Sequence, residues 1–561
     1  MKKQSAYFWV MGGVLVLLGL FSIYLALNRI YQVDEAQNLF MARIIGTGQT
    51  TTYFTNAPLW LMGPLAWLAR SVKESAELFM WNRWIFLGIF WLNIGLMALA
   101  TGIRIRSAQG LFILLMAATL APLWDYGFEV RHDNLILTGL LLIWWLGRTR
   151  PRGIASYFLL GLLAVLVQFV AFKAFVYVVP LSAAFLLFPP SAHQQTRLRL
   201  ATAWAAGALA AFLLCRIAYQ VSGLWPIYLA GLRGGFEASG GGSRFGPGLA
   251  LGRMLTQTPL LLAITVAALW WMGQELRRRG REALTYEGAG PEALLFLAML
   301  GAFLVNPTPF PYNLVNLVPF AFLLSFRFLG PTLQSITERP VSLALAGGIL
   351  CFTHAVPFAI ATWRHVDWSN ERQELLMHTA ESLTDPAHDA VYDAIGMVPT
   401  RPSIHFRWYL HSLNIRTFID GKDLGVQQLL NANPPAVLIP SYRTDWLRKE
   451  DWTFIQSRYI PLADDFWVLG QVLPLGGGSF VIVHPGRYQL LGQRNGSISP
   501  LDAGLCDGRA TGSRPVELSP GRHELSCPQD TRPAFIWVGP RLENLPELGV
   551  GDHQRLFVNW Y

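Results

Sequence analysis

Long apolar stretches recur through the first two thirds of the chain. Segments of about 17 to 25 apolar residues match the thickness of a bilayer's hydrocarbon core when they form helices. We therefore expect a mainly α, polytopic transmembrane protein with about eleven membrane-spanning helices, a few of them short. The expected spans are 7–27, 82–101, 108–124, 134–147, 155–171, 173–189, 200–222, 252–273, 291–306, 312–329 and 341–362.

The pattern changes after about residue 362. Residues 371–383 have the spacing of an amphipathic helix, and 390–393 and 436–440 are short apolar runs typical of buried strands. From about residue 471 short strand patterns alternate with turn residues, as at 479–484 and 534–538. We expect three parts: a transmembrane domain at 1–362, an α/β region at 363–470 and a β-rich, sandwich-like subdomain at 471–561.

The composition agrees with a membrane protein. Hydrophobic residues make up 53% of the chain and charged residues only 14%, far below the roughly 25% of soluble domains. The formal net charge is +9, and we assign this excess to cytoplasmic loops. Since no basic run is interleaved with aromatic residues, we expect no nucleic-acid partner.

The positions of Lys and Arg predict the topology. Cytoplasmic loops are enriched in these residues, and the expected spans bring every basic cluster to one side and the C-terminus to the other. Residues 57–69 are apolar but short and contain Pro58, Gly63 and Pro64, which favours an interfacial or re-entrant helix. The first apolar run lacks a clear cleavage site, so we interpret it as an uncleaved helix.

Several charged residues are predicted to lie at membrane depth, and they gather on the predicted outer side. Such groups are costly unless they pair or face water, which makes them candidates for a functional site. Asp34 and Glu35 follow the first apolar run directly, although carboxylates there could simply cap a helix. The other candidates are Glu129, Arg131, His132, Asp133, Lys173, Tyr312 and Asn313.

Each of these candidates also has a simpler interpretation. Arg131 and Asp133 could pair to anchor a loop, and Lys173 could extend to the lipid headgroups. Tyr312 and Asn313 could be interfacial anchors. The glycine-rich segment 231–248 is either a linker or a lid over a substrate.

Four cysteines complete the inventory. Cys215 and Cys351 lie in apolar runs and are expected to be inert. Cys506 and Cys527 lie in the β-rich region, where export would permit a disulfide, but their spacing alone leaves free thiols equally open. No cysteine pattern indicates zinc.

Four short motifs resemble those of the GT-C membrane glycosyltransferases, which include the bacterial lipid A aminoarabinose transferases and the protein O-mannosyltransferases. The first is Asp34-Glu35-Ala36 with Ala42, Ile45 and Gly46 after it. The others are Arg131-x-Asp133, the Lys173 to Pro180 segment and the Tyr312 to Pro319 helix start. Together they cover roughly the first 330 residues.

The resemblance implies an inverting transferase that moves a sugar from a polyprenyl phosphate to a hydroxyl of a glycan, lipid or protein. It implies Asp34 as the catalytic base with Glu35 beside it, and Lys173, Arg131 and His132 at the donor phosphate. Glu129 and Asp133 would form a second acidic position, and Tyr312 and Asn313 would line the donor cavity. Such chemistry needs no cofactor, although a divalent ion among Asp34, Glu129 and Asp133 stays open.

The resemblance also implies a place in the cell. We expect a monomer in the bacterial inner membrane, with the active site and the C-terminal domain on the periplasmic side. The chain departs from the aminoarabinose transferases at Asn56-Ala57-Pro58, so the acceptor is left undetermined. A ligase or polymerase using a lipid pyrophosphate donor and a transporter of lipid-linked sugars are the alternatives.

Overall fold

A computed structural model describes most of the chain in two compact units. The described residues are 2–46, 59–104, 107–149, 153–188, 194–226, 228–230, 232–233, 246–284, 290–306, 309–337, 351–402, 420–423, 425–494, 497–501, 504–511, 514–540, 542 and 546–558. The first, which we call the helical unit, comprises Met1–Arg29, Phe54–Pro64 and Met80–Trp368. The second, the mixed unit, comprises Ile30–Tyr53, Leu65–Phe79 and Ser369–Tyr561.

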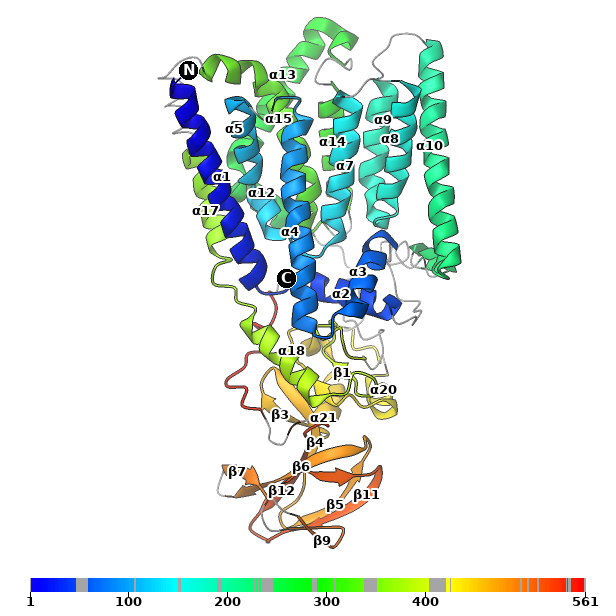
Figure 1. Ribbon diagram of the computed structural model, residues 1–561, viewed down its shortest axis with the longest axis vertical. Coiled ribbons are helices and arrows are strands. Elements are labelled where there is room, and N and C mark those ends of the chain that lie inside the picture. The colour runs from blue at the N-terminus through cyan, green and yellow to red at the C-terminus, as the bar shows by residue number, and fades with distance from the viewer. Residues whose placement is uncertain are drawn as a thin grey trace. The chain divides into compact units, whose positions relative to one another are not determined.

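The helical unit is a bundle whose long helices run side by side (Figure 1). Apolar residues, most of them not branched at Cβ, fill these helices, as both helix propensity and a lipid surrounding favour. The α-helices are α1 (Lys2–Asn28), α4 (Ser75–Ala100, its first turn in the mixed unit), α5 (Ala108–Ala118), α6 (Ala121–Tyr126), α7 (His132–Thr149), α8 (Ile154–Gln168), α9 (Phe175–Leu187), α10 (Gln194–Val221), α12 (Gly248–Gln257), α13 (Pro259–Arg279), α14 (Gly290–Val305), α15 (Leu314–Thr337) and α17 (Val356–Trp363). Short 3₁₀ turns, η1 (Phe172–Ala174) and η3 (Pro311–Asn313), precede α9 and α15.

The helices confirm a mainly α, multi-pass membrane protein. Within the described ranges, five helices are long and apolar enough to span a bilayer: Trp9–Asn28, Ser75–Ala100, Arg197–Val221, Pro259–Arg279 and Pro311–Leu329. Four shorter apolar helices accompany them. The expectation of about eleven spans stays a prediction, since part of the last span, 341–350, lies outside the described residues.

Two expected spans are interrupted. The stretch 108–124 divides into α5 and α6, and the stretch 252–273 divides at Thr258 between α12 and α13. In each case a proline stands in the first turn of the second helix, Pro122 in α6 and Pro259 in α13. Proline has no N–H to continue a preceding helix but is well tolerated at a helix start, which explains both interruptions.

Helices α8 and α10 pack unusually closely through two glycines. A Cβ on Gly161 would lie 1.9 Å from the carbonyl oxygen of Trp204, and one on Gly207 would lie 1.9 Å from that of Phe158. Small residues at such positions let helix backbones approach in a membrane. This contact holds α8, which leads into η1, in a fixed position.

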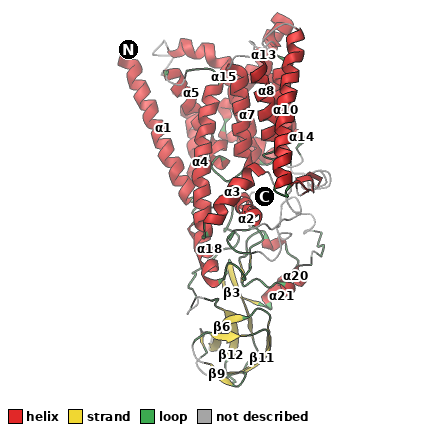
Figure 2. Ribbon diagram, turned by 45° about the vertical axis from the view of Figure 1, so that its right-hand side comes forward, coloured by secondary structure: helices red, strands yellow, loops and turns green. Residues whose placement is uncertain are grey.

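The mixed unit combines helices from two distant parts of the sequence with all of the strands (Figures 1 and 2). Its helices are α2 (Val33–Gly46), most of α3 (Leu59–Ser71), α18 (Glu371–Leu383), α20 (Val426–Ala432) and α21 (Lys449–Gln456). Arg43 Nη1 donates to the carbonyl oxygen of Ala69 at 2.9 Å, which joins α2 to α3. Both helices fall inside the expected transmembrane domain 1–362, and most of their residues belong to the mixed unit.

Two sheets form the core of the mixed unit. The eight-stranded sheet has the order β1 (Val391–Tyr392), β2 (Val437–Leu438), β4 (Phe466–Val472), β12 (Arg532–Trp537), β6 (Gly486–Arg494) and β10 (Val516–Leu518), with β3 (Tyr459–Ala463) beside β4 and β7 (Ser497–Pro500) beside β6. Its β1–β2 pair is parallel. The four-stranded sheet has the order β5 (Gly477–Ile482), β11 (Gly521–Ser526), β8 (Gly504–Cys506) and β9 (Arg509–Thr511).

The two sheets are joined by aromatic residues. The ring centroids of Phe480 in β5 and Phe535 in β12 are 4.4 Å apart. Phe535 also contacts Tyr488 of β6 at 5.7 Å. The expected boundary between residues 470 and 471 falls inside β4, so the two predicted C-terminal parts share one sheet.

The disulfide considered for Cys506 and Cys527 is absent, and both are free cysteines. Cys506 in β8 is opposite Leu525 in β11, so Cys527 is two residues further along. Such diagonal neighbours lie about 7 to 8 Å apart, beyond the usual Cα separation of a disulfide. The register of the two strands therefore explains the free thiols.

Candidate functional site

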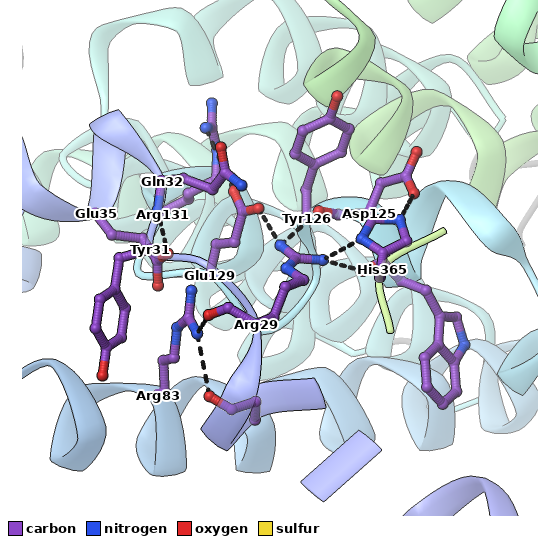
Figure 3. Close-up of polar contacts among 12 residues, drawn as sticks. Arg29, Tyr31, Gln32, Glu35, Arg83, Asp125, Tyr126, Glu129, Arg131 and His365 are labelled. Atoms are coloured by element: carbon purple, nitrogen blue, oxygen red, sulfur yellow. Dashed lines mark hydrogen bonds and ion pairs between the residues drawn. The ribbon is translucent and has the colours of Figure 1, made fainter. Parts of the chain in front are cut away.

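The helical unit contains a mostly buried group of charged residues around α6, the start of α7 and the end of α1 (Figure 3). We call it the charge cluster. Its cations are more numerous than its carboxylates, so it carries a net positive charge. The members are Arg29, Asp125, Glu129, Arg131, Asp133, Lys173, Arg253, Arg364 and His365.

Arg29 is the centre of one part of the cluster. It ion-pairs with Glu129, and both side chains are fully buried. Its guanidinium also donates to the carbonyl oxygens of Trp124 at 3.0 Å and Asp125 at 2.9 Å. Arg83 in turn donates to the carbonyl oxygens of Ala26, at 3.2 Å, and Arg29. These bonds satisfy carbonyl groups at the end of α1, where a helix has no further N–H groups to offer.

His365 connects Arg29 to the side chain of Asp125. Its Nδ1 lies 3.2 Å from Arg29 Nη1, and its Nε2 lies 2.8 Å from Asp125 Oδ1. The tautomer with hydrogen on Nε2 satisfies both contacts, because Nδ1 then accepts from arginine and Nε2 donates to the carboxylate. A side chain at the end of α17 thus joins α1 to α6.

Asp125 gathers further donors. Arg364 Nη2 donates to both of its carboxylate oxygens, at 2.8 and 2.7 Å, and Gln257 Nε2 donates to Oδ2 at 3.0 Å. Arg253 lies 3.8 Å from the same carboxylate and donates to the Tyr126 hydroxyl at 3.1 Å. Asp125 therefore fixes the relative positions of α6, α12 and the end of α17.

Asp133 is the centre of the other part of the cluster. Lys173 Nζ lies 2.6 Å from its Oδ1, and Arg131 Nε and His132 Nε2 lie 3.6 and 3.7 Å from its Oδ2. Asn316 of α15 also donates to Oδ1 at 3.3 Å. Arg131 additionally lies 3.6 Å from Glu129, which links both parts of the cluster.

Tyr312 supplies an aromatic face to two of these cations. The Arg131 guanidinium lies 4.2 Å from the centroid of its ring, and Lys173 Nζ lies 4.7 Å from it. Both distances are within the range of cation–π attraction. The neighbouring Asn313 is buried. Seven predicted site residues are thus together: Glu129, Arg131, His132, Asp133, Lys173, Tyr312 and Asn313.

Asp34 and Glu35 belong to the mixed unit, where they open α2. Glu35 is fully buried, and its Oε2 accepts a hydrogen bond from the backbone N–H of Gln32 at 2.9 Å. This is a helix-capping contact, so Glu35 has the structural role that the sequence left open. Asp34 is half-buried.

Tyr442 and Arg443 lie near Asp34 within the mixed unit. Burial raises the pKa of the Tyr442 hydroxyl, the adjacent Arg443 charge opposes this, and the negative charge of Asp34 adds to the rise. Arg443 Nε donates to the Tyr442 hydroxyl at 3.0 Å and faces the ring of Trp446 at 4.6 Å. A carboxylate is therefore flanked by aromatic and cationic side chains of the C-terminal region.

Several members of the charge cluster were not predicted as site residues. Arg29, Arg364 and His365 stand at helix ends, where basic residues have ordinary explanations. Arg253 lies within α12. Asp125 lies between the expected spans 108–124 and 134–147, and nothing in the sequence shows that side chains from α12 and the end of α17 converge on it. Residues 56–58, where the sequence departs from the aminoarabinose transferases, lie outside the described residues. So does most of the glycine-rich segment 231–248.

Throughout the part of the chain that the structure describes, no group of three or more His, Cys, Asp or Glu is arranged to hold a metal ion.

Comparisons with known proteins identify the fold. No protein-family model and no characterised protein sequence matches the chain. Two structures of the Archaeoglobus fulgidus oligosaccharyltransferase are similar to it, AglB with an inhibitory peptide and dolichol-phosphate (TM-score 0.45, 11% identity, 88% of this chain and 74% of that one) and the apo form (0.46, 11%, 87% and 74%).

A third structure is ArnT from Cupriavidus metallidurans bound to undecaprenyl phosphate. It has a TM-score of 0.52 and 12% identity, over 83% of this chain and 98% of that one. The chain has the GT-C fold. Within this GT-C fold the charge cluster occupies the ends of α1, α6, α7 and α17, together with η1 and α12.

Proposed function

We propose that this chain is a membrane glycosyltransferase that moves a sugar from a polyprenyl-phosphate-linked donor to a hydroxyl acceptor, with inversion. The proposal includes an inner-membrane location, with the chemistry at the periplasmic face. The GT-C fold supports the enzyme class, since ArnT, which shares it, binds undecaprenyl phosphate.

One observation carries the choice of donor. Arg131 and Lys173 face the same tyrosine ring, and both are close to Asp133. The cluster around them holds more cations than carboxylates, which suits an anion that gains charge as it leaves. A polyprenyl phosphate gains charge in this way when its bond to the sugar breaks.

In the proposed reaction Asp34 removes the acceptor proton as the hydroxyl attacks the anomeric carbon. The bond from that carbon to the phosphate oxygen breaks, and Lys173 and Arg131 stabilise the departing phosphate. His132 stands beside them as a further phosphate contact. General-base catalysis typically contributes 10²- to 10⁴-fold to the rate.

The decisive experiment measures sugar transfer by the purified full-length protein with a polyprenyl-phosphate sugar and a hydroxyl acceptor. Asp34→Asn should lower turnover by roughly 10²- to 10⁴-fold, whereas Asp367→Asn, at an exposed carboxylate, should not change it. Wild-type turnover in Asp34→Asn would overturn the assignment of the base. Mass spectrometry of the product distinguishes one transferred sugar from the chain that a ligase or polymerase would transfer.

The donor-binding residues are tested separately. Lys173→Ala should mainly raise the KM for the donor, while Lys449→Ala, at an exposed lysine of α21, should leave it unchanged. Unaltered donor kinetics in Lys173→Ala would remove its proposed role at the phosphate.

A further inference from the structure

The backbone just before Asp34 is held by one side chain of α18. The N–H of Tyr31 donates to Oε1 of Gln373 at 2.6 Å. Gln373 Nε2 donates in turn to the carbonyl oxygen of Tyr31 at 3.0 Å and to that of Leu556 at 2.8 Å. The side-chain amide thus uses its oxygen and both N–H groups, and Gln373 is buried.

A second set of contacts holds the side chain of Tyr31. Its hydroxyl donates to Glu374 Oε1 at 2.7 Å, and Asn370 Nδ2 donates to the same oxygen at 3.0 Å. The Tyr31 ring also packs against Phe79, with centroids 4.3 Å apart. Since Glu35 accepts from the N–H of Gln32, hydrogen bonds fix the chain on both sides of Val33.

These contacts all lie within the mixed unit, and they connect the start of α2 to the region that follows the last transmembrane segment. A general base must be placed accurately, because an error of about 1 Å can cost on the order of 10²-fold in rate. The side chain of Asp34 is carried by the first turn of α2, so its position depends on how the chain enters that helix.

We propose that Gln373 is a positioning residue for Asp34, through which the C-terminal region sets the rate of sugar transfer. This inference rests on the proposed function, in which Asp34 is the catalytic base. It gives the C-terminal region a part in the reaction: Gln373 and Leu556 hold the peptide groups of Tyr31, and Tyr31 sets the entry into α2.

The chemistry of glutamine makes the proposal specific. Only an amide both accepts from the Tyr31 N–H and donates to two carbonyl oxygens. Methionine has a similar length and neither function. A glutamate carboxylate keeps the acceptor and loses both donors, but regains one donor when it is protonated.

The first test is hydrogen exchange of the full-length, substrate-free protein in detergent. In Gln373→Met, residues 30–36 should exchange at least about tenfold faster, because the Tyr31 amide has lost a buried partner. The matched control is Glu371→Ala, at an exposed position of the same helix, and it should exchange at the wild-type rate. Wild-type exchange in Gln373→Met would overturn the inference, whatever reaction the protein catalyses.

The second test is kinetic. Gln373→Met should lower kcat by roughly 10- to 100-fold and leave the KM for the polyprenyl-phosphate sugar near its wild-type value. Gln373→Glu should be slower than wild type at neutral pH, and its rate relative to wild type should rise as the pH falls. A role in folding alone would instead lower the amount of active protein, with no such change in the pH profile.

The outcomes separate this inference from the proposed function. Faster exchange with an unchanged kcat, in a protein that Asp34→Asn inactivates, would overturn the positioning role alone. Full activity of Asp34→Asn would overturn the function and this role together. If Gln373→Met proves too unstable to purify, Gln373→Glu carries both tests, because at neutral pH it lacks both donors to Tyr31 and Leu556. Wild-type exchange of residues 30–36 together with a wild-type kcat in that variant would overturn the inference.

Discussion

The ammonium group of Lys173 lies 2.6 Å from Oδ1 of Asp133. The carboxylate thereby balances the cation that we assign to the donor phosphate. Asp133→Asn removes this balance inside a buried cluster, and losing one partner of a buried ion pair typically costs about 3 to 5 kcal/mol. We expect a lower thermal unfolding temperature in detergent, measured by tryptophan fluorescence.

The phosphate ligand provides the control for this prediction. If phosphate takes the place of the Asp133 carboxylate, added polyprenyl phosphate should stabilise Asp133→Asn more than wild type. The double variant Asp133→Asn with Lys173→Met should recover part of the lost stability, because no isolated charge remains. Equal stabilisation of single variant and wild type by the ligand would contradict this view.

The ion pair of Arg29 and Glu129 predicts a second loss of stability. Both side chains are fully buried, so Glu129→Gln leaves the Arg29 charge without its carboxylate partner. A cost of about 3 to 5 kcal/mol is expected, observed as a lower unfolding temperature. Glu275→Gln removes the partner of Arg279, whose side chain is exposed, and should cost at most about 1 kcal/mol; similar losses in both variants would be evidence against the importance of burial.

The sequence predicts the membrane class, the mainly α fold and much of the charge cluster, because each depends on local composition. Apolar length marks the helices, and a charge at membrane depth is conspicuous wherever it stands. Lys173 contacts Asp133, and both Arg131 and Lys173 contact Tyr312, so these four candidate residues lie together.

The sequence does not show which residues, distant along the chain, come into contact in the folded protein. Asp125 resembles any loop carboxylate until α12 and α17 bring Arg253, Arg364 and His365 to it. Gln373 looks like one polar residue of an amphipathic helix, and only folding places its amide against Tyr31. The sequence also does not show that the helix is interrupted at Thr258, because a proline such as Pro259 occurs both in kinked helices and at the start of new ones.

A histidine of the mixed unit predicts a pH dependence of stability. Although partial burial lowers the pKa of His553, its hydrogen bond to Asp464 and the charges of Asp445 and Asp464 raise it above the ordinary 6.5. The protonated ring is therefore favoured in the folded state. Its contribution is complete below about pH 6.5 and is lost as the pH rises through the higher folded pKa.

The hydrogen bond between His553 and Asp464 also lowers the pKa of the Asp464 carboxyl group. The stabilisation from this pair therefore disappears in strong acid as well, when the Asp464 carboxylate becomes protonated. Thermal unfolding of the full chain at a series of pH values should show the loss on the alkaline side. His553→Asn should flatten this part of the curve. An unchanged slope in His553→Asn would assign the pH dependence to other groups.

The free thiols of the β-rich region predict an order of chemical labelling. Burial, with a smaller effect of Asp507, raises the pKa of Cys506 to about 11, and Cys527 is less buried. Because the thiolate is the reactive form, an alkylating reagent at pH 8 should modify Cys527 before Cys506, as mass spectrometry of the folded protein would show. Reducing agent should leave the unfolding temperature unchanged; a lower temperature would indicate a disulfide after all.

The ring of Tyr312 offers the most selective test of the donor site, because its face contacts Arg131 and Lys173 without adding charge. Cation–π attraction contributes about 0.5 to 2 kcal/mol, or roughly 2- to 30-fold in affinity. Tyr312→Leu should weaken polyprenyl phosphate binding to that extent, measured by titration of the purified protein, whereas Tyr312→Phe keeps the ring and should bind within about twofold of wild type. If Tyr312→Phe were as weak as Tyr312→Leu, the hydroxyl would be the group that matters, and the two cations would act on the phosphate without help from the aromatic face.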